Sequence, residues 1–175
     1  ASTCMPSKPW LASCLAILAL TPPAWAGASN LVSGAFGAEL KIAVAPRDAS
    51  RVTGYFTTQD KTCRPYFHGL PKGEIYQIAL ANAADATFAS YGELWMTYDG
   101  NIPIVQLNVA MPPGCRNAAP DLATRKYRLQ YKADWHGIRL VSAKRAYFHN
   151  DAHESTRQRA YVVKWDAVAV LALLA

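Results

Sequence analysis

The chain has 175 residues, 51% of them hydrophobic, and a formal net charge of +6. This length suits one domain of ordinary size, or one domain with a small appendage, rather than a large multidomain chain. The hydrophobic half supplies enough apolar surface for a core, which excludes a chain that is too polar to fold.

Residues 5–26 have the three parts of a secretory signal peptide. Lys8 is the positive charge, residues 11–20 form an apolar run too short to span a bilayer as a helix, and residues 24–26 (AWA) form a cleavage signal. We therefore expect residues 1–26 to be a leader with a cleavable signal peptide. The mature protein would then be periplasmic or secreted, without a transmembrane span. Residues 11–14 (LASC) also resemble a lipoprotein box, so a lipid-anchored chain and an uncleaved anchor stay open as alternatives.

Export would place the mature chain in an oxidising compartment. Cleavage removes Cys4 and Cys14 and leaves Cys63 and Cys115. A single pair in an exported chain predicts one disulfide, with two buried free thiols as the alternative. No CxxC motif or Cys/His cluster surrounds either thiol, which argues against a metal site.

Residues 27–133 read as a β-rich domain of short strands separated by turns. Asp99 and Gly100 stand between two apolar runs and give a strong hairpin signal. Strands at intervals of roughly ten residues are typical of a small antiparallel sandwich or barrel. The predicted strands, which carry alternating, β-branched or aromatic residues, are residues 39–44, 51–57, 62–68, 74–80, 92–98, 102–109 and 127–133.

Several further features of this part give local predictions. Residues 28–37 are small and glycine-rich and predict a mobile segment before the first strand. Gly54 indicates a bulge or a close backbone approach, and Pro65 indicates a strand end or an edge strand. Residues 69–73 (GLPKG) predict a turn. Residues 82–90 are the only stretch that could form a short helix.

The positive charge is concentrated in the later part of the sequence. Residues 39–115 hold 6 Lys/Arg and 7 Asp/Glu, whereas residues 116–164 hold 11 Lys/Arg and 4 Asp/Glu. The excess is either a solvated face or a surface for an anionic partner, such as a cell-wall polymer, an acidic lipid head group or an acidic protein. Nucleic acid is not expected as the partner of an exported chain.

Residues 141–171 predict two strands, 141–149 and 160–164, joined by a polar loop at 150–158 and followed by a third strand at 167–171. This stretch resembles a bacterial SH3-like (SH3b) domain with the pattern Y-[LV]-[VIL]-K-G-D-x-V-x-V-L. Trp165 stands where the family has Gly. The matching residues are Tyr161, Val162, Val163, Lys164, Asp166, Val168, Val170 and Leu171. Because the family continues with further strands, residues 134–175 are expected to be a truncated SH3-like module. The expected fold is therefore mostly β: a small sandwich or barrel followed by this incomplete module.

The resemblance implies a binding unit of the cell envelope. Candidate binding residues are the large aromatic and basic side chains of this region, although core packing is the alternative for each aromatic: Trp135, Arg145, Tyr147, Phe148 and Trp165. His149 and His153 are weak metal candidates, since their four-residue spacing suits zinc on a helix but falls here in a loop. Neither a metal nor a cofactor is expected.

The sequence carries no nucleophile signature, so we do not expect an enzyme. The leading hypothesis is an exported, non-enzymatic binding protein that engages cell-wall material or an envelope protein through the SH3-like module. Two alternatives remain. One is a periplasmic inhibitor or immunity protein against a cell-wall-degrading enzyme, and the other is an enzyme of the envelope.

Overall fold

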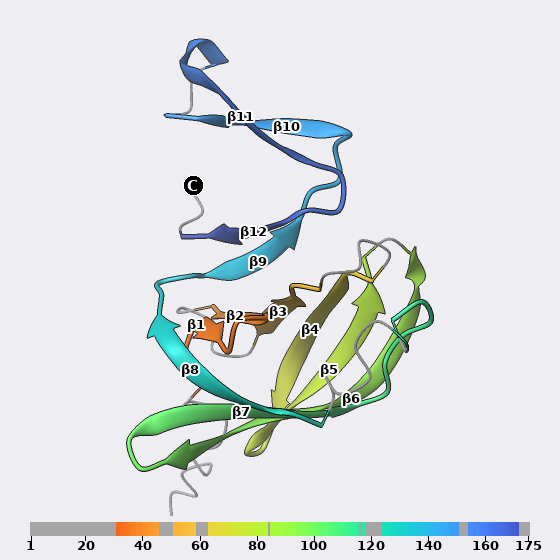
Figure 1. The fold of residues 1–175 in the computed structure, drawn as a ribbon, viewed down its shortest axis with the longest axis vertical. Coiled ribbons are helices and arrows are strands. Elements are labelled where there is room, and N and C mark those ends of the chain that lie inside the picture. The colour runs from red at the N-terminus through yellow and green to blue at the C-terminus, as the bar shows by residue number, and fades with distance from the viewer. Residues whose placement is uncertain are drawn as a thin grey trace, which may run out of the picture.

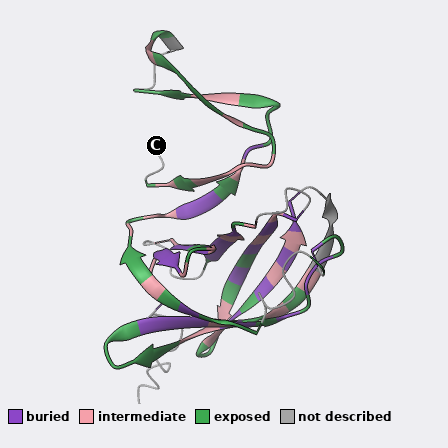
Figure 2. Cartoon of the chain, in the orientation of Figure 1, coloured by how far each residue is buried: buried purple, intermediate pink, exposed green. Residues whose placement is uncertain are grey.

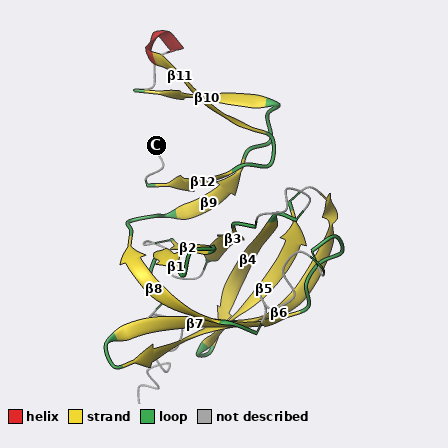
Figure 3. Ribbon diagram, viewed as in Figure 1, coloured by secondary structure: helices red, strands yellow, loops and turns green. Residues whose placement is uncertain are grey.

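The computed structural model describes residues 31–45, 51–58, 63–83, 85–115, 117, 124–150 and 154–171, with the backbone alone at 85–89 and 154. The predicted leader, Cys4, Cys14 and His153 lie outside these residues. Strands make up most of the described chain, and the helical element within it is a single 3-10 turn, η1 (Glu154–Thr156; Figure 3). None of the described segments forms a helix long and apolar enough to cross a membrane.

Eight antiparallel strands close into a barrel in which each strand pairs with the next and β1 pairs with β8 (Figure 1). The prediction of a small antiparallel sandwich or barrel is thus confirmed as a barrel. The strands are β1 (Gly34–Phe36), β2 (Leu40–Val44), β3 (Val52–Phe56), β4 (Pro65–Lys72), β5 (Ile75–Asn82), β6 (Asp85–Asp99), β7 (Ile102–Val109) and β8 (Lys126–Lys132).

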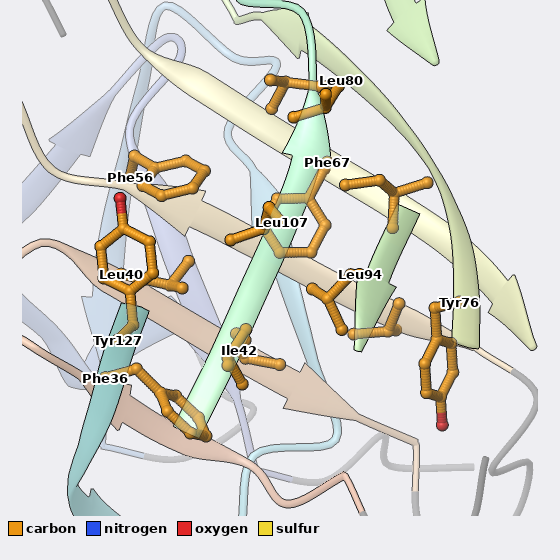
Figure 4. Close-up of a cluster of buried hydrophobic side chains, with 14 of the residues drawn as sticks. Phe36, Leu40, Ile42, Phe56, Phe67, Tyr76, Leu80, Leu94, Leu107 and Tyr127 are labelled. Carbon is orange, nitrogen blue, oxygen red and sulfur yellow. The ribbon is translucent and has the colours of Figure 1, made fainter. Parts of the chain in front are cut away.

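Apolar side chains from all eight strands fill the barrel. The ring of Phe56 packs against two other rings of the core, with centroids at 6.1 Å from Phe67 and 5.8 Å from Tyr127. An eight-stranded barrel has an interior that side chains alone can fill, and here they do, so the interior is the core. Figure 4 shows ten of these buried residues: Phe36, Leu40, Ile42, Phe56, Phe67, Tyr76, Leu80, Leu94, Leu107 and Tyr127.

Two glycines meet local demands of the barrel. A Cβ at Gly54 would overlap the ring of Phe67, and the pairing of β3 with both neighbours runs without a shift. Gly54 therefore marks a close approach rather than a bulge. Gly100 has a φ of 60° in the turn between β6 and β7, a conformation that glycine adopts without strain. The hairpin predicted at Asp99–Gly100 is confirmed by the pairing of Asp99 with Ile102.

Three local predictions in the barrel are wrong. Gly34–Phe36 is not a mobile segment but β1, because pairing with β2 and β8 closes the barrel. β4 runs through the predicted turn at residues 69–73 to Lys72, and the chain turns at Gly73, which has a φ of 63°. Residues 85–90 form the start of β6 instead of a helix. Their backbone pairs with β5, so sheet pairing overrides a weak local preference.

After the barrel, four strands form two separate ribbons. β9 (Gly137–Leu140) pairs with β12 (Ala167–Val170), and β10 (Arg145–His149) pairs with β11 (Arg157–Val163). The sequence predicts a strand over residues 141–149 and none at residues 137–140. Instead, β9 begins at Gly137, and residues 141–144 connect β9 to β10. The error arises because the short segment Gly137–Leu140 has a glycine and an arginine and shows little strand character by itself.

β9 lies on the outer face of the barrel over β2 and β3. Ala43 and Thr53 form an outward-facing pair that is buried nonetheless, since β9 covers it. The backbone of Ile138 is bound from two sides: its N–H donates to Oγ1 of Thr53 at 2.8 Å, and its carbonyl accepts from the hydroxyl of Tyr66 at 3.2 Å. An ion pair of 3.2 Å joins Arg64 to Asp166, just before β12.

The β10–β11 hairpin, in contrast, stands away from the barrel. Figure 1 shows it at the far end of the molecule, beyond the β9–β12 ribbon. Figure 2 shows exposed and half-buried residues along both of its strands, whereas buried and exposed residues alternate in the barrel. The hairpin is thus presented to solvent by a ribbon that is itself fixed to the barrel.

The predicted disulfide between Cys63 and Cys115 is present, and both residues are fully buried. Their Cα atoms are 4.8 Å apart across a separation of 52 residues. The bond joins the residues before β4 to the segment after β7. Closing a loop of this length stabilises the fold by about 4 kcal/mol in the chain-entropy description.

Candidate functional site

One face of the β10–β11 hairpin carries four side chains in stacked contact, which we call the Arg–Tyr ladder: Arg145, Tyr147, Arg157 and Tyr161. The rings of Tyr147 and Tyr161 lie 5.8 Å apart between centroids, tilted by 59°. The guanidinium carbon of Arg145 lies 4.4 Å from the centre of the Tyr161 ring, and that of Arg157 lies 4.6 Å from the Tyr147 ring. An arginine therefore stands at each end of an aromatic pair.

The hairpin register produces this arrangement. Tyr147 pairs directly with Tyr161, and Arg145 lies two residues before Tyr147, on the same face of β10. The register shifts between Tyr147 and His149, so that Arg157 pairs with His149 although it lies four residues from Tyr161. The shift brings Arg157 to the Tyr147 ring, whereas Arg145 reaches the Tyr161 ring across regularly paired residues.

A hydrogen bond also connects two members of the ladder. Nη1 of Arg145 donates to the hydroxyl oxygen of Tyr147 at 3.4 Å. This bond lowers the pKa of Tyr147 and raises the pKa of Arg145, with the attraction of opposite charges as a further cause in both cases. Arg145 therefore stays charged and is held in place by two contacts.

The structure brings together some of the predicted binding residues and separates others. Arg145 and Tyr147 join in the ladder. Phe148 is 45% exposed and, by strand alternation, points to the other face of β10. Trp135 belongs to the barrel end, where its ring packs edge-on against Tyr131 at 6.1 Å and its carbonyl accepts from Ser33 at 2.8 Å.

Trp165 lies in the turn between β11 and β12. Its φ of 74° falls in the left-handed region, which a glycine adopts without strain. The N–H of Trp165 donates to the Val141 carbonyl at 2.8 Å, and Asp166 closes the turn through its bonds with Val163. The ammonium of Lys164 lies 4.7 Å from the Trp165 ring centre. The turn thus holds Trp165 in a conformation that favours glycine.

Only one of the two histidines proposed as weak metal candidates lies in the described part of the chain. His149 ends β10 opposite Arg157, whereas His153 lies outside the described residues. Within the described ranges, no three His, Cys, Asp or Glu side chains gather into a cluster that could hold a metal.

A shallow hollow of about 490 Å³ lies on β4, β5 and β6. Two rows of outward-facing residues flank it, and Gly69, Ile78 and Gly92 pair across its floor. Tyr91, which is 80% exposed, and Leu70 supply its apolar lining. The polar lining consists of His68, Gln77 and Glu93. This volume is within the range of ligand sites, but the hollow lies on β4–β6, separate from the hairpin that carries the ladder.

Sequence reasoning missed two members of the ladder, Arg157 and Tyr161. The sequence holds a usable signal, because an arginine precedes a tyrosine in residues 145–147 and again in residues 157–161. Cross-strand pairing brings such residues together. The missing information was the register, since the strand of residues 160–164 was predicted to begin three residues too late to include Arg157.

Comparisons with protein-family models, with curated proteins and with solved structures find no match to this chain. The resemblance of residues 141–171 to SH3-like domains therefore stays a proposal.

Proposed function

We propose that the chain is an exported, non-enzymatic binding protein of the bacterial cell envelope, which engages cell-wall material or an envelope protein through an SH3-like module. The observation that carries the proposal is the exposed Arg–Tyr ladder on a hairpin that stands clear of the barrel. Tyrosine and arginine are the residue types that contribute most to binding surfaces, because both offer large contact areas and polar groups.

The barrel supports this proposal as a platform. Its interior is occupied by core side chains, so a partner is expected on the outer surface. β9 fixes the appended strands to that surface through the backbone of Ile138 and through the ion pair between Arg64 and Asp166. A ligand that touches the hairpin is thus held at a defined place relative to the barrel.

The test is a pull-down with purified cell-wall sacculi and, in parallel, with periplasmic extract. Tyr147→Ala combined with Tyr161→Ala removes the aromatic pair of the ladder. Tyr98→Ala combined with Ile102→Ala is the control, since these side chains are 53% and 39% exposed on the barrel, away from the hollow. We expect the ladder variant to lose capture and the control to keep it. Equal capture by both variants would contradict the proposal.

A second candidate, an inhibitor of a cell-wall-degrading enzyme, is favoured by a different observation. The disulfide pins an exposed turn after β7, in which the N–H of Cys115 donates to the Pro112 carbonyl at 3.0 Å and Gly114 has a φ of 83°. Such a rigid turn suits insertion into an active-site cleft. Hydrolysis of cell-wall fragments by a lysozyme-type enzyme, with and without the protein, tests this candidate. Hydrolysis by the protein alone would instead indicate an envelope enzyme.

A further inference from the structure

The Arg–Tyr ladder lies in a region with excess positive charge. Residues 141–164 hold five Lys/Arg and two Asp/Glu. Of the two acids, Asp151 lies outside the described residues, and Glu154 begins η1 with only its backbone described. Asp166 is engaged by Arg64 of the barrel. No ion pair between described side chains involves an arginine of the ladder, so the hairpin face attracts anions.

Stacking holds the two ladder arginines in fixed positions while leaving donors available. A guanidinium has five N–H groups in a planar fork. Arg145 uses one of them toward Tyr147, and the central carbon of each guanidinium lies over a tyrosine ring. The remaining N–H groups can bind a carboxylate or sulfate in the bidentate geometry for which arginine is suited.

We infer that the Arg–Tyr ladder binds a linear acidic polysaccharide, a polymer with a carboxylate or sulfate on repeating sugar rings. The two guanidinium groups stand at opposite ends of the Tyr147–Tyr161 pair, so one small anion cannot occupy both. A polymer of acidic sugars supplies two anionic groups and, between them, a ring with an apolar face that can lie on the tyrosines.

Other anionic partners match this surface less well. A polyphosphate has repeated charge but no apolar surface to cover the tyrosines. An acidic peptide has flexible side chains, which lose rotamer freedom on binding. A neutral glycan would leave both arginines without an anionic partner. The alternation of charge and ring along the ladder therefore favours the acidic sugar polymer.

This inference deepens the proposed function and rests on it, because it names the ligand class of the same hairpin face. The two can be tested apart. The pull-down on sacculi and extract tests whether the ladder binds an envelope partner at all, whereas a defined polymer tests the ligand class. Capture of sacculi without binding of acidic polysaccharide leaves the proposed function standing and overturns the inference.

The experiment measures dissociation constants of the full mature chain for polyuronate oligosaccharides, with neutral dextran and polyglutamate in parallel arms. Polyuronate should bind, dextran should not, and polyglutamate should bind at least about tenfold more weakly than polyuronate, since it carries charge without sugar rings. Binding should weaken several-fold when the salt concentration rises from about 0.05 M to about 0.3 M. Polyglutamate that binds as tightly as polyuronate would overturn the inference, because charge alone would then explain the affinity.

Variants then locate the site. Arg145→Gln combined with Arg157→Gln should weaken polyuronate binding by about tenfold or more. Arg125→Gln combined with Arg128→Gln removes the same charge from the barrel, where both arginines form exposed ion pairs, and should change the affinity by less than about twofold. Equal losses in the two double variants would overturn the assignment to the ladder.

A conservative variant guards against loss of the hairpin itself. Tyr147→Phe combined with Tyr161→Phe keeps both rings and the stacking but removes the hydroxyl groups, so it should retain most of the affinity. Circular dichroism and the melting temperature show whether each variant is folded. A folded Phe variant that binds as weakly as the Arg145→Gln/Arg157→Gln variant would contradict the role given to the stacked rings.

Discussion

Thr53→Val is the sharpest test of how the appended strands are held on the barrel. Thr53 is 4% exposed, and its hydroxyl oxygen accepts the N–H of Ile138, which is 2% exposed, at 2.8 Å. Valine has nearly the same shape as threonine, so packing is kept while the acceptor is lost. A buried N–H left without a partner costs about 1–3 kcal/mol. For a chain of this size, that cost lowers the melting temperature by about 2–12 °C.

Urea denaturation followed by fluorescence, together with a thermal melt, measures the change in the free energy of unfolding. Thr53→Ser is the control, because it keeps the hydroxyl and loses only a methyl group. Amide exchange at Ile138 should become faster in the valine variant and stay slow in the serine variant. If serine destabilises the protein as much as valine does, then packing rather than the hydrogen bond holds β9, and the reasoning is wrong.

Three further predictions concern the described structure. Burial raises the pKa of Tyr66 above the usual 10.0. The stability contributed by the neutral hydroxyl is therefore complete below pH 10 and is lost as the pH rises through the folded-state pKa. Thermal melts between pH 8 and 11 should show this loss of stability, and Tyr66→Phe should make the loss smaller. Replacing Cys63 and Cys115 by Ser should lower the free energy of unfolding by about 4 kcal/mol in urea titrations. Trp165→Gly relieves the strain of a left-handed backbone, but it gives the unfolded chain more freedom and removes the ring beside Lys164. Thermal melts should therefore show a net change in the free energy of unfolding below about 1 kcal/mol. A larger loss would mean that the ring packs on the fold.

The barrel could be predicted largely because its strands alternate. The predicted strand of residues 39–44 corresponds to β2, that of 102–109 to β7, and that of 127–133 to β8. Closure could not be predicted, because it depends on β1, a three-residue strand of Gly, Ala and Phe with no periodicity to detect. The closure of the barrel is defined by the long-range pairing of β1 with β8.

The candidate site could be predicted in part for a similar reason. Arg145 and Tyr147 were singled out by residue type and by their position in a basic stretch. Their partners come from the other strand: Tyr161 pairs directly with Tyr147, and the shifted register between Tyr147 and His149 places Arg157 opposite His149. A strand irregularity of this kind has no sequence signature. Trp135 was predicted as a binding residue by its type, yet its position against Tyr131 gives it a packing partner at the barrel.

If the ladder binds as proposed, the separation of the hairpin from the barrel makes that binding independent of barrel stability. Barrel stability depends on a closed sheet, a filled interior and the disulfide, none of which includes a ladder residue. A two-stranded hairpin is marginal by itself, and each cross-strand pair in the ladder adds only about 0.2–1 kcal/mol. Substitutions in the ladder should therefore alter ligand affinity while the barrel unfolds at an unchanged temperature. Conversely, loss of the Thr53–Ile138 hydrogen bond should weaken the platform without removing any group that touches the ligand.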